Sequence, residues 1–363
     1  MLGWISRRTR SYEEDGLRTQ QRLGPSGGRP PLLRFLSLRS VQLTAAFWVL
    51  ATIAVFLIVG DGELPFGERP SLEGVLLAGE VINGWATVGV ALILIGVTYL
   101  VTKGRAVPDM VARAPGRSAA LAETAGLVGY GILVQFGGLL LGRAVGEHAI
   151  SLHMHGTLYG ADNPVSPTEA TVWMLYNFVF YAVLPYLFFR QRGYTNEQLN
   201  LRSSNKVNDA LLILVILLLE STIQLSLVSD AIFRLDANQL LVGIPLAFLL
   251  NLFGTALPIM VFIYCILLPR FLKLTGSVAA TVVLGGIAYA VIHFFESWTA
   301  YDSLTNGALS VIFLMFQYFG PGMIKSFLTL RTGNAWVHVW AYHAIAPHVT
   351  VDTPNLVNVF RLR

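Results

Sequence analysis

The sequence predicts an all-α fold, a polytopic membrane helix bundle with about nine transmembrane spans. The first observation behind this prediction is composition: 54% of the 363 residues are hydrophobic and only 13% are charged, whereas soluble domains carry about 25% charged residues. The second is that long apolar runs recur along the chain. This composition excludes a disordered chain, a collagenous chain and a disulfide scaffold, and it argues against a water-soluble enzyme.

Nine apolar runs match or approach the roughly 20 helical residues that cross a bilayer core about 30 Å thick. They are residues 41–60, 82–102, 119–141, 171–189, 210–228, 239–269, 277–295, 308–330 and 335–349. The sixth run is long and contains Pro245, Asn251, Gly254 and Pro258, so we expect it to be kinked or broken. The ninth is short, and Pro347 interrupts it.

The basic residues predict the orientation. If the N-terminus is cytoplasmic and every run crosses, 20 of the 25 basic residues fall in cytoplasmic segments, with Lys325 and Arg331 counted among them. The remaining five are Arg69, Arg143, Arg234, Arg361 and Arg363. Acidic residues gather in the first outer loop: Asp61, Glu63, Glu68, Glu73 and Glu80. This positive-inside pattern predicts a multi-pass protein of the cell membrane, with a cytoplasmic N-terminus and an extracytoplasmic C-terminus.

The chain divides into four predicted regions. Residues 1–40 are Arg-rich and form a flexible cytoplasmic tail that we expect to contact anionic lipid. Residues 41–230 form a five-span scaffold, residues 239–349 a four-span core, and residues 350–363 a tail. The single cysteine, Cys265, excludes an internal disulfide and a cysteine-based metal cluster. The bilayer is the expected partner, and nucleic acid is not.

Glu220 is the clearest ionisable residue inside a predicted span, where such groups are costly and require an explanation. It follows the apolar stretch 211–219, and Gln224 lies one turn later on the same helical face. Two interpretations remain open: a proton-carrying or metal-facing carboxylate, or a neutral glutamate hydrogen-bonded to a neighbouring helix. Glu123, near the end of a run, is expected at the membrane interface.

The seven histidines are clustered. Three fall in the outer loop between the third and fourth runs: His148, His153 and His155. Three more lie at five-residue intervals in the ninth run: His338, His343 and His348. Because a helix turns about 100° per residue, these last three cannot share one face of a regular helix, although Pro347 could change the position of His348.

His293 lies near the outer end of the seventh run, and Glu296 follows it on the same helical face. Neutral imidazoles together with a carboxylate are common zinc ligands. His293, Glu296 and His343 are therefore a candidate metal-binding set, with zinc as the expected ion.

Several motifs in the last 110 or so residues carry a family resemblance. Tyr289-Ala-Val-Ile-His293 has the spacing [F/Y]xxxH, and Arg331-Thr-Gly-Asn-Ala-Trp336 leads to His343, 50 residues after His293. Leu-Leu-Pro-Arg-Phe at 267–271 precedes Thr-Gly-Ser at 275–277. In these features residues 239–349 resemble the core of the CAAX-protease and bacteriocin-processing family (CPBP, also called Abi), a family of intramembrane metalloproteases.

The resemblance implies a hydrolase: a metal-dependent intramembrane endopeptidase that processes a membrane-bound or lipidated protein, as CAAX proteases do. It implies that His293 and His343 hold the metal, and it adds Tyr289, His338 and His348 as further site residues. The EExxxR motif of the family is absent, however.

The positions of that motif hold Ile259, Met260 and Tyr264, and Pro347 replaces the asparagine of the family's HxxxN motif. A catalytic carboxylate must then come from elsewhere. Glu296 is one turn from His293, and Glu220 lies deeper in the predicted bilayer.

Three other functions remain open. The chain could be a degenerate CPBP member that binds membrane proteins without cleaving them, as the missing glutamate pair suggests. It could be a membrane oxidoreductase with a di-metal site built from the outer-loop and ninth-run histidines. It could also be a small-solute transporter, for which the broken sixth run and Glu220 are the support.

Overall fold

The computed structural model describes residues 36–60, 62–66, 76–146, 148–155 and 165–363. These described residues form helices and turns, with no strand and one isolated bridge between Leu201 and Asn334. The predicted all-α class is confirmed. Residues 1–43 and 44–363 are separate units, and the first contributes only residues 36–43 to the description. The predicted tail at 1–40 therefore falls mostly outside the described residues, as do Asp61, Glu68 and Glu73.

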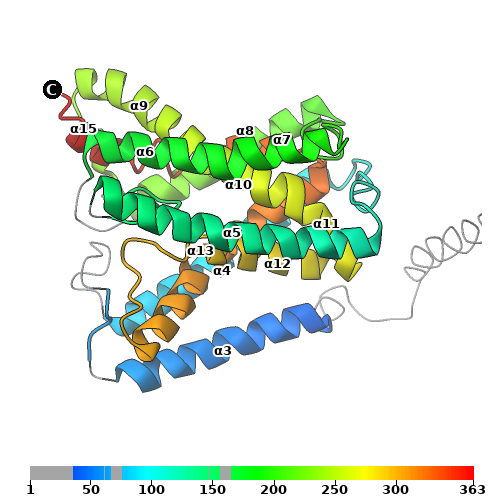
Figure 1. Ribbon diagram of the computed structural model, residues 1–363, viewed down its shortest axis with the longest axis horizontal. Coiled ribbons are helices and arrows are strands. Elements are labelled where there is room, and N and C mark those ends of the chain that lie inside the picture. Colours follow the sequence, from blue (N-terminus) through cyan, green and yellow to red (C-terminus); the bar gives the residue numbers. More distant parts are fainter. Residues whose placement is uncertain (1–35, 61, 67–75, 147, 156–164) are drawn as a thin grey trace, which may run out of the picture. The chain divides into compact units, whose positions relative to one another are not determined.

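Seven helical stretches among the described residues are long and apolar enough to cross a membrane. They are α3 (Arg39–Val59), α4 (Leu77–Thr102), α5 (Arg117–Val145), α6 to α7 (Pro167–Gln191), α8 with η3 (Lys206–Val228), α9 to α11 (Ala237–Thr275) and α13 (Leu304–Thr332). The shorter α12 (Val278–Val291) is also apolar. These helices correspond to the first eight predicted spans, most of which Figure 1 labels.

π-Helical segments interrupt two of these stretches. Between α6 (Pro167–Asn177) and α7 (Leu184–Gln191) lies η2 (Phe178–Val183). The sixth run is α9 (Ala237–Asn251), η5 (Leu252–Ala256), α10 (Leu257–Ile259), η6 (Met260–Leu267) and α11 (Leu268–Thr275). It stays helical throughout, so π turns replace the expected break. Residues 254–256 and 258–272 are buried, which places this run in the core of the bundle.

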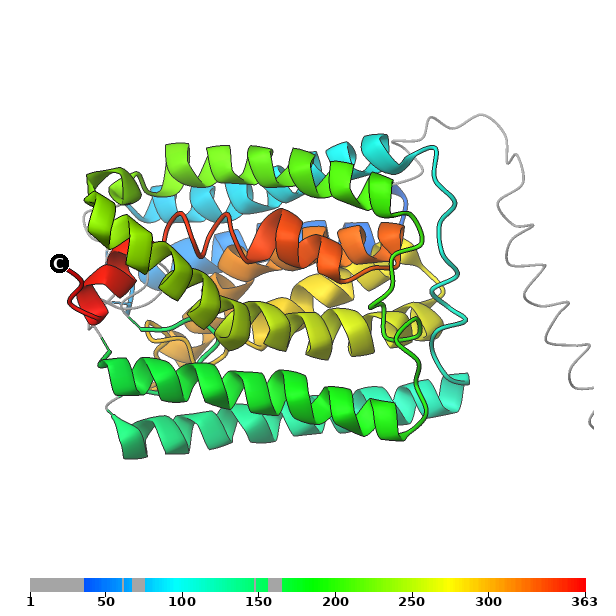
Figure 2. The same ribbon diagram turned by 90° about the horizontal axis from the view of Figure 1, so that it is seen from above.

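The ninth run is not a regular helix. It consists of α14 (Trp336–His338), the π-helical η7 (Val339–His343) and turns that lead to α15 (Thr353–Val359). Asn334 pairs with Leu201 in the loop before α8 (Lys206–Ile223). At the other end of this stretch, the Leu362 carbonyl accepts a hydrogen bond from Gln239 in the first turn of α9. The chain thus passes along the bundle between these points, and Figure 2 shows this stretch in orange and red among the other helices.

Burial explains why this irregular stretch is tolerated. Fifteen of the 20 residues from 334 to 353 are buried, and the other five are half-buried. Non-helical backbone at membrane depth occurs only where protein or a water-filled cavity surrounds it. Pro347 has no backbone N–H, so a regular helix would lose a hydrogen bond there. The ninth run is therefore an interior segment that other helices cover.

Close helix packing fixes the elements around this segment. α12 and α4 both pack against α13. A Cβ atom on Gly322 of α13 would lie 2.6 Å from the Cβ of Tyr289, and one on Gly286 would lie 2.8 Å from the ring of Phe319. The two helices approach this closely because small residues lie at the crossing, as is common in membrane bundles. Tyr289 and the following turn are thereby held against α13.

Candidate functional site

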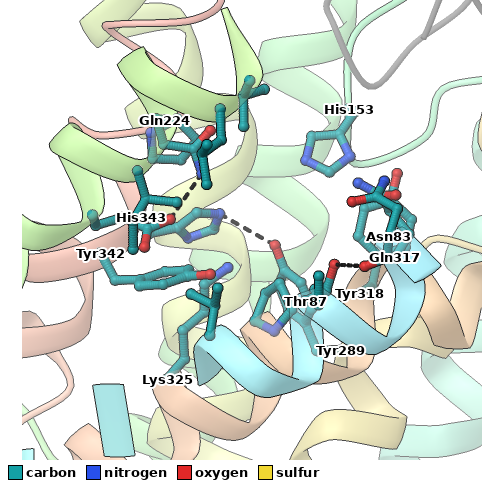
Figure 3. A pocket seen from close by; sticks show the side chains of 18 of the residues that line it. Asn83, Thr87, His153, Gln224, Tyr289, Gln317, Tyr318, Lys325, Tyr342 and His343 are labelled. Carbon is teal, nitrogen blue, oxygen red and sulfur yellow. Dashed lines mark hydrogen bonds between the residues drawn. The ribbon is translucent and has the colours of Figure 1, made fainter. Parts of the chain in front are cut away.

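A polar pocket of about 510 Å³ opens among α4, α8, α13 and the ninth run (Figure 3). Nine of its lining residues carry ionisable or phenolic groups: Glu80, His153, Glu220, Tyr289, Tyr318, Lys325, Tyr342, His343 and His348. Polar and ionisable residues are rare inside membrane bundles and usually mark a functional site. The pocket is therefore the first candidate for function.

One group at this pocket has the geometry of a metal site. His153, His293 and Glu296 are buried, and one ligand atom from each lies within 4.8 Å of the others. These three residues could hold a metal ion. Two of them are residues that the sequence singled out, and the third comes from the outer-loop histidines. His343 is not in this group, so its pairing with His293 on one metal stays a prediction.

His293 is held in the form that a cation requires. It follows the end of α12, and its Nδ1 lies 2.5 Å from the carbonyl oxygen of Tyr289, to which it must donate. Its ring stacks on Tyr318, with ring centres 4.0 Å apart. Nε2 is buried and has no hydrogen-bond partner among the described residues. The lone pair of Nε2 is thus available to a metal, and this orphaned atom fits the predicted zinc.

Glu296 connects His293 to the outer loop. Its Oε1 accepts a hydrogen bond of 3.2 Å from the backbone N–H of His153 and lies 3.4 Å from the ring Nδ1 of the same residue. The ring centres of His153 and His293 are 4.8 Å apart. The carboxylate therefore lies beside both imidazoles.

Hydrogen bonds from two helices hold the segment that carries His153. The Ser151 carbonyl accepts from Trp173 Nε1 at 2.9 Å and from Asn177 Nδ2 at 2.8 Å. Thr255 donates to the Leu152 carbonyl at 2.8 Å. Sequence reasoning placed His153 in an outer loop without linking it to His293. No spacing in the sequence could have linked them, because these contacts join distant parts of the chain.

The other outer-loop histidines form a separate cluster. The rings of His148 and His155 are 4.1 Å apart, and His148 Nδ1 lies 3.3 Å from Glu169 Oε1. Burial, which disfavours the imidazolium form, is the main cause that lowers the pKa of His155 to about 3, and the nearby His148 contributes to this value. His155 is therefore neutral at physiological pH.

The ninth-run histidines lie along the core. The ring of His338 is 4.3 Å from the ring of Tyr264, and the rings of His343 and His348 are 5.1 Å apart. His343 Nε2 is 3.5 Å from the Tyr289 hydroxyl. A regular helix would have separated these histidines onto different faces. The π turn and the turns after it allow all three to be buried.

Glu220 and Lys325 are two buried ionisable residues that line the pocket. Gln224 donates to Glu220 Oε1 at 2.8 Å, and Oε2 has no hydrogen-bond partner among the described residues. The Lys325 amine lies 3.7 Å from the ring centre of Tyr289 and 5.4 Å from that of Tyr342 (Figure 3). Lys325 lies within α13 and not in a loop. It therefore does not belong among the cytoplasmic basic residues from which the sequence predicted the orientation.

The positions of the missing family motif are apolar in the structure as well. Ile259 and Met260 are buried in the sixth run, and the ring of Tyr264 packs on His338. Neither of the first two side chains can hold a metal or accept a proton. Of the two glutamates considered from the sequence, Glu296 joins the metal-binding group, whereas Glu220 lines the pocket.

Comparison of the chain with protein-family models, with curated proteins and with solved structures gives no match. Membership of the CPBP family therefore stays a prediction from the sequence motifs. The functional argument depends on the site itself.

Proposed function

We propose that the chain is a metal-dependent intramembrane endopeptidase of the CPBP type, acting on a membrane-bound or lipidated protein. The observation that carries this proposal is the buried group of His153, His293 and Glu296 beside a polar pocket inside an apolar helix bundle. The two imidazoles are donors that suit zinc, and the carboxylate of Glu296 lies beside them. The pocket gives a substrate segment a polar environment within the bundle.

His153, His293 and Glu296 have different roles in the proposed peptide hydrolysis. When bound, zinc supplies Lewis acidity. Glu296 takes a proton from the attacking water, whose oxygen forms a bond to the carbonyl carbon of the substrate. The carbon–nitrogen bond then breaks, and the proton passes to the leaving amine. Lys325 and Tyr289 line the same pocket, where their N–H and O–H groups can donate to carbonyl groups of the substrate.

Two alternatives have specific support. Ile259 and Met260 at the positions of the family's glutamates favour a degenerate member that binds membrane proteins without cleaving them. The irregular ninth run and the buried Glu220 and Lys325 favour a small-solute transporter, because transporters build their sites from discontinuous spans. Metal content distinguishes the endopeptidase from the transporter, and cleavage distinguishes it from the degenerate member.

The orientation is part of the proposal. With the N-terminus in the cytoplasm, reporter fusions after Arg117 and after Arg202 should report the cytoplasm. A fusion after Asp236 should report the outside. A cytoplasmic signal at Asp236 would contradict the assignment of α8 and α9 as consecutive crossings.

The functional test combines metal analysis with variants in the native host. Purified protein should contain about one zinc per chain. In a strain without the endogenous gene, sequencing of the N-termini of membrane proteins should show cleavage products with the wild type and with the exposed control Glu197→Gln. His293→Ala and Glu296→Gln should lose these products at normal folded protein levels. Glu220→Gln should retain them.

Two outcomes would contradict the proposal. One is purified protein that binds no metal, and the other is an unchanged set of cleavage products with both His293→Ala and Glu296→Gln. Metal binding without cleavage by the wild type would favour the degenerate member.

A further inference from the structure

His348 has the same hydrogen-bonding arrangement as His293. Its Nδ1 lies 2.8 Å from Asp352 Oδ2, and its Nε2 is buried with no hydrogen-bond partner among the described residues. In His293 the Tyr289 carbonyl occupies Nδ1 and leaves Nε2 without a partner in the same way. Metal-binding histidines almost always have one ring nitrogen fixed by a carboxylate, a carbonyl or water. Two buried histidines at this site therefore have the arrangement of metal ligands.

His153 lies close to both of them. Its ring centre is 4.8 Å from that of His293 and 5.8 Å from that of His348. Imidazoles that share one zinc ion have ring centres roughly 5 to 6 Å apart, because each zinc–nitrogen bond is about 2.0–2.1 Å long. His348, like His343, lies outside the group whose ligand atoms are all within 4.8 Å of one another, so its imidazole has to shift toward His153 and His293 when a metal binds. His343 is placed differently from His348, since its Nε2 faces the Tyr289 hydroxyl.

The number of protein ligands that a catalytic zinc ion takes is the reason to give His348 and Glu296 different roles. Zinc is usually tetrahedral, and catalytic sites keep three protein ligands and one open position. If His153, His293 and His348 all bind, a fourth bond from Glu296 would close the site. The carboxylate of Asp352 lies behind His348, where it offsets part of the positive charge. Lys325 is a basic residue near the site, and its amine lies over the ring of Tyr289.

We infer that His348, oriented by Asp352, is the third histidine of a metal site with His153 and His293. Glu296 then serves as the base. The assignment of Glu296 as base rests on the proposed function, whereas the three-histidine metal site can be tested without any substrate.

The test measures zinc affinity of the full-length protein in detergent, by competition with a chromophoric chelator. His348→Ala should weaken binding about 100-fold, and Asp352→Asn about tenfold, as loss of an orienting partner does. Glu296→Gln and the control His148→Ala should stay within about threefold of the wild type. His148 is a suitable control because it lies in the separate cluster with His155 and Glu169.

A second variant keeps the test decisive if His348→Ala does not fold. His348→Cys replaces one zinc ligand by another and should retain tight binding. Loaded with cobalt, it should show a sulfur-to-cobalt charge-transfer band that the wild type lacks. A merely structural role for His348 predicts no such band.

The outcomes separate this inference from the proposed function. If the wild type binds no zinc, both fail. If the wild type binds zinc, while His348→Ala retains it and His348→Cys shows no charge-transfer band, only the third ligand is wrong. If Glu296→Gln loses zinc and His348→Ala does not, Glu296 is the ligand and this inference is overturned.

Discussion

At the scale of single residues, side chains outside the candidate metal-binding group of His153, His293 and Glu296 hold it in position. Asn177 is 1% exposed, and its Nδ2 donates to the Ser151 carbonyl two residues before His153. Trp173 donates to the same oxygen. A buried carbonyl with two donors is firmly fixed, because losing either partner leaves a polar atom less well satisfied. The position of His153 is therefore set from α6.

Asn177→Ala should weaken zinc binding about tenfold, because the Ser151 carbonyl loses one of its two donors and His153 is held less firmly. The measurement is the chelator competition titration of the purified protein. Asn306→Ala is the matched control, because its amide donates to Asp302 just before α13, away from His153. Wild-type affinity in Asn177→Ala would show that Trp173 and Thr255 fix the segment without Asn177.

At the scale of elements, the crossing of α12 and α13 sets the position of the site. Gly322 lies against Tyr289, which is the residue whose carbonyl orients His293. Nothing larger than glycine fits there, because a Cβ atom would also lie 2.8 Å from the Cα of Gly286. Helix packing and site geometry are thus coupled at one contact.

Gly322→Ala should lower the free energy of unfolding by about 1–3 kcal/mol, because the added methyl group overpacks the crossing. Gly129→Ala in α5 is the matched control. A Cβ there meets nothing within 4 Å, and alanine is the better helix former, so stability should not fall. Thermal unfolding in detergent measures both. Equal stability of the two variants would mean that α12 and α13 can separate at little cost.

At the scale of the whole unit 44–363, buried ion pairs join loops that are distant in sequence. Asp209 pairs with Arg105 at 2.5 Å, and the two side chains are 5% and 3% exposed. The same carboxylate accepts from Ser203 at 2.7 Å and from Asn334 at 2.9 Å. It thus connects the loop after α4, the loop before α8 and the start of the ninth run.

Asp209→Ala should lower the free energy of unfolding by about 3–5 kcal/mol, because it leaves the buried Arg105 without its counter-charge. Asp230→Ala should cause no measurable change, since the pair of Asp230 with Arg234 is largely exposed. Unfolding of the purified protein in detergent tests both variants. A small loss in Asp209→Ala would show that the remaining partners of Arg105 compensate.

Much of the fold could be predicted because hydropathy is a local property. A run of about 20 apolar residues must become a helix in a bilayer, whatever its neighbours are. The first eight predicted spans follow from this rule, and all correspond to helices. The link between His293 and Glu296 is local too, because they are three positions apart in one short segment. The sequence alone therefore determined the helical class and two of the three residues of the candidate metal-binding group.

The tertiary structure decided what depends on contacts between distant segments. It brought His153 to His293, turned Lys325 into the pocket and gave the ninth run its irregular path. None of these follows from periodicity, because each depends on which helices pack together and where a loop is held. The partner of His348 is local in sequence, at Asp352, yet only the turns after η7 bring the two side chains together. Local hydropathy specifies helices, whereas the site arises from how they pack.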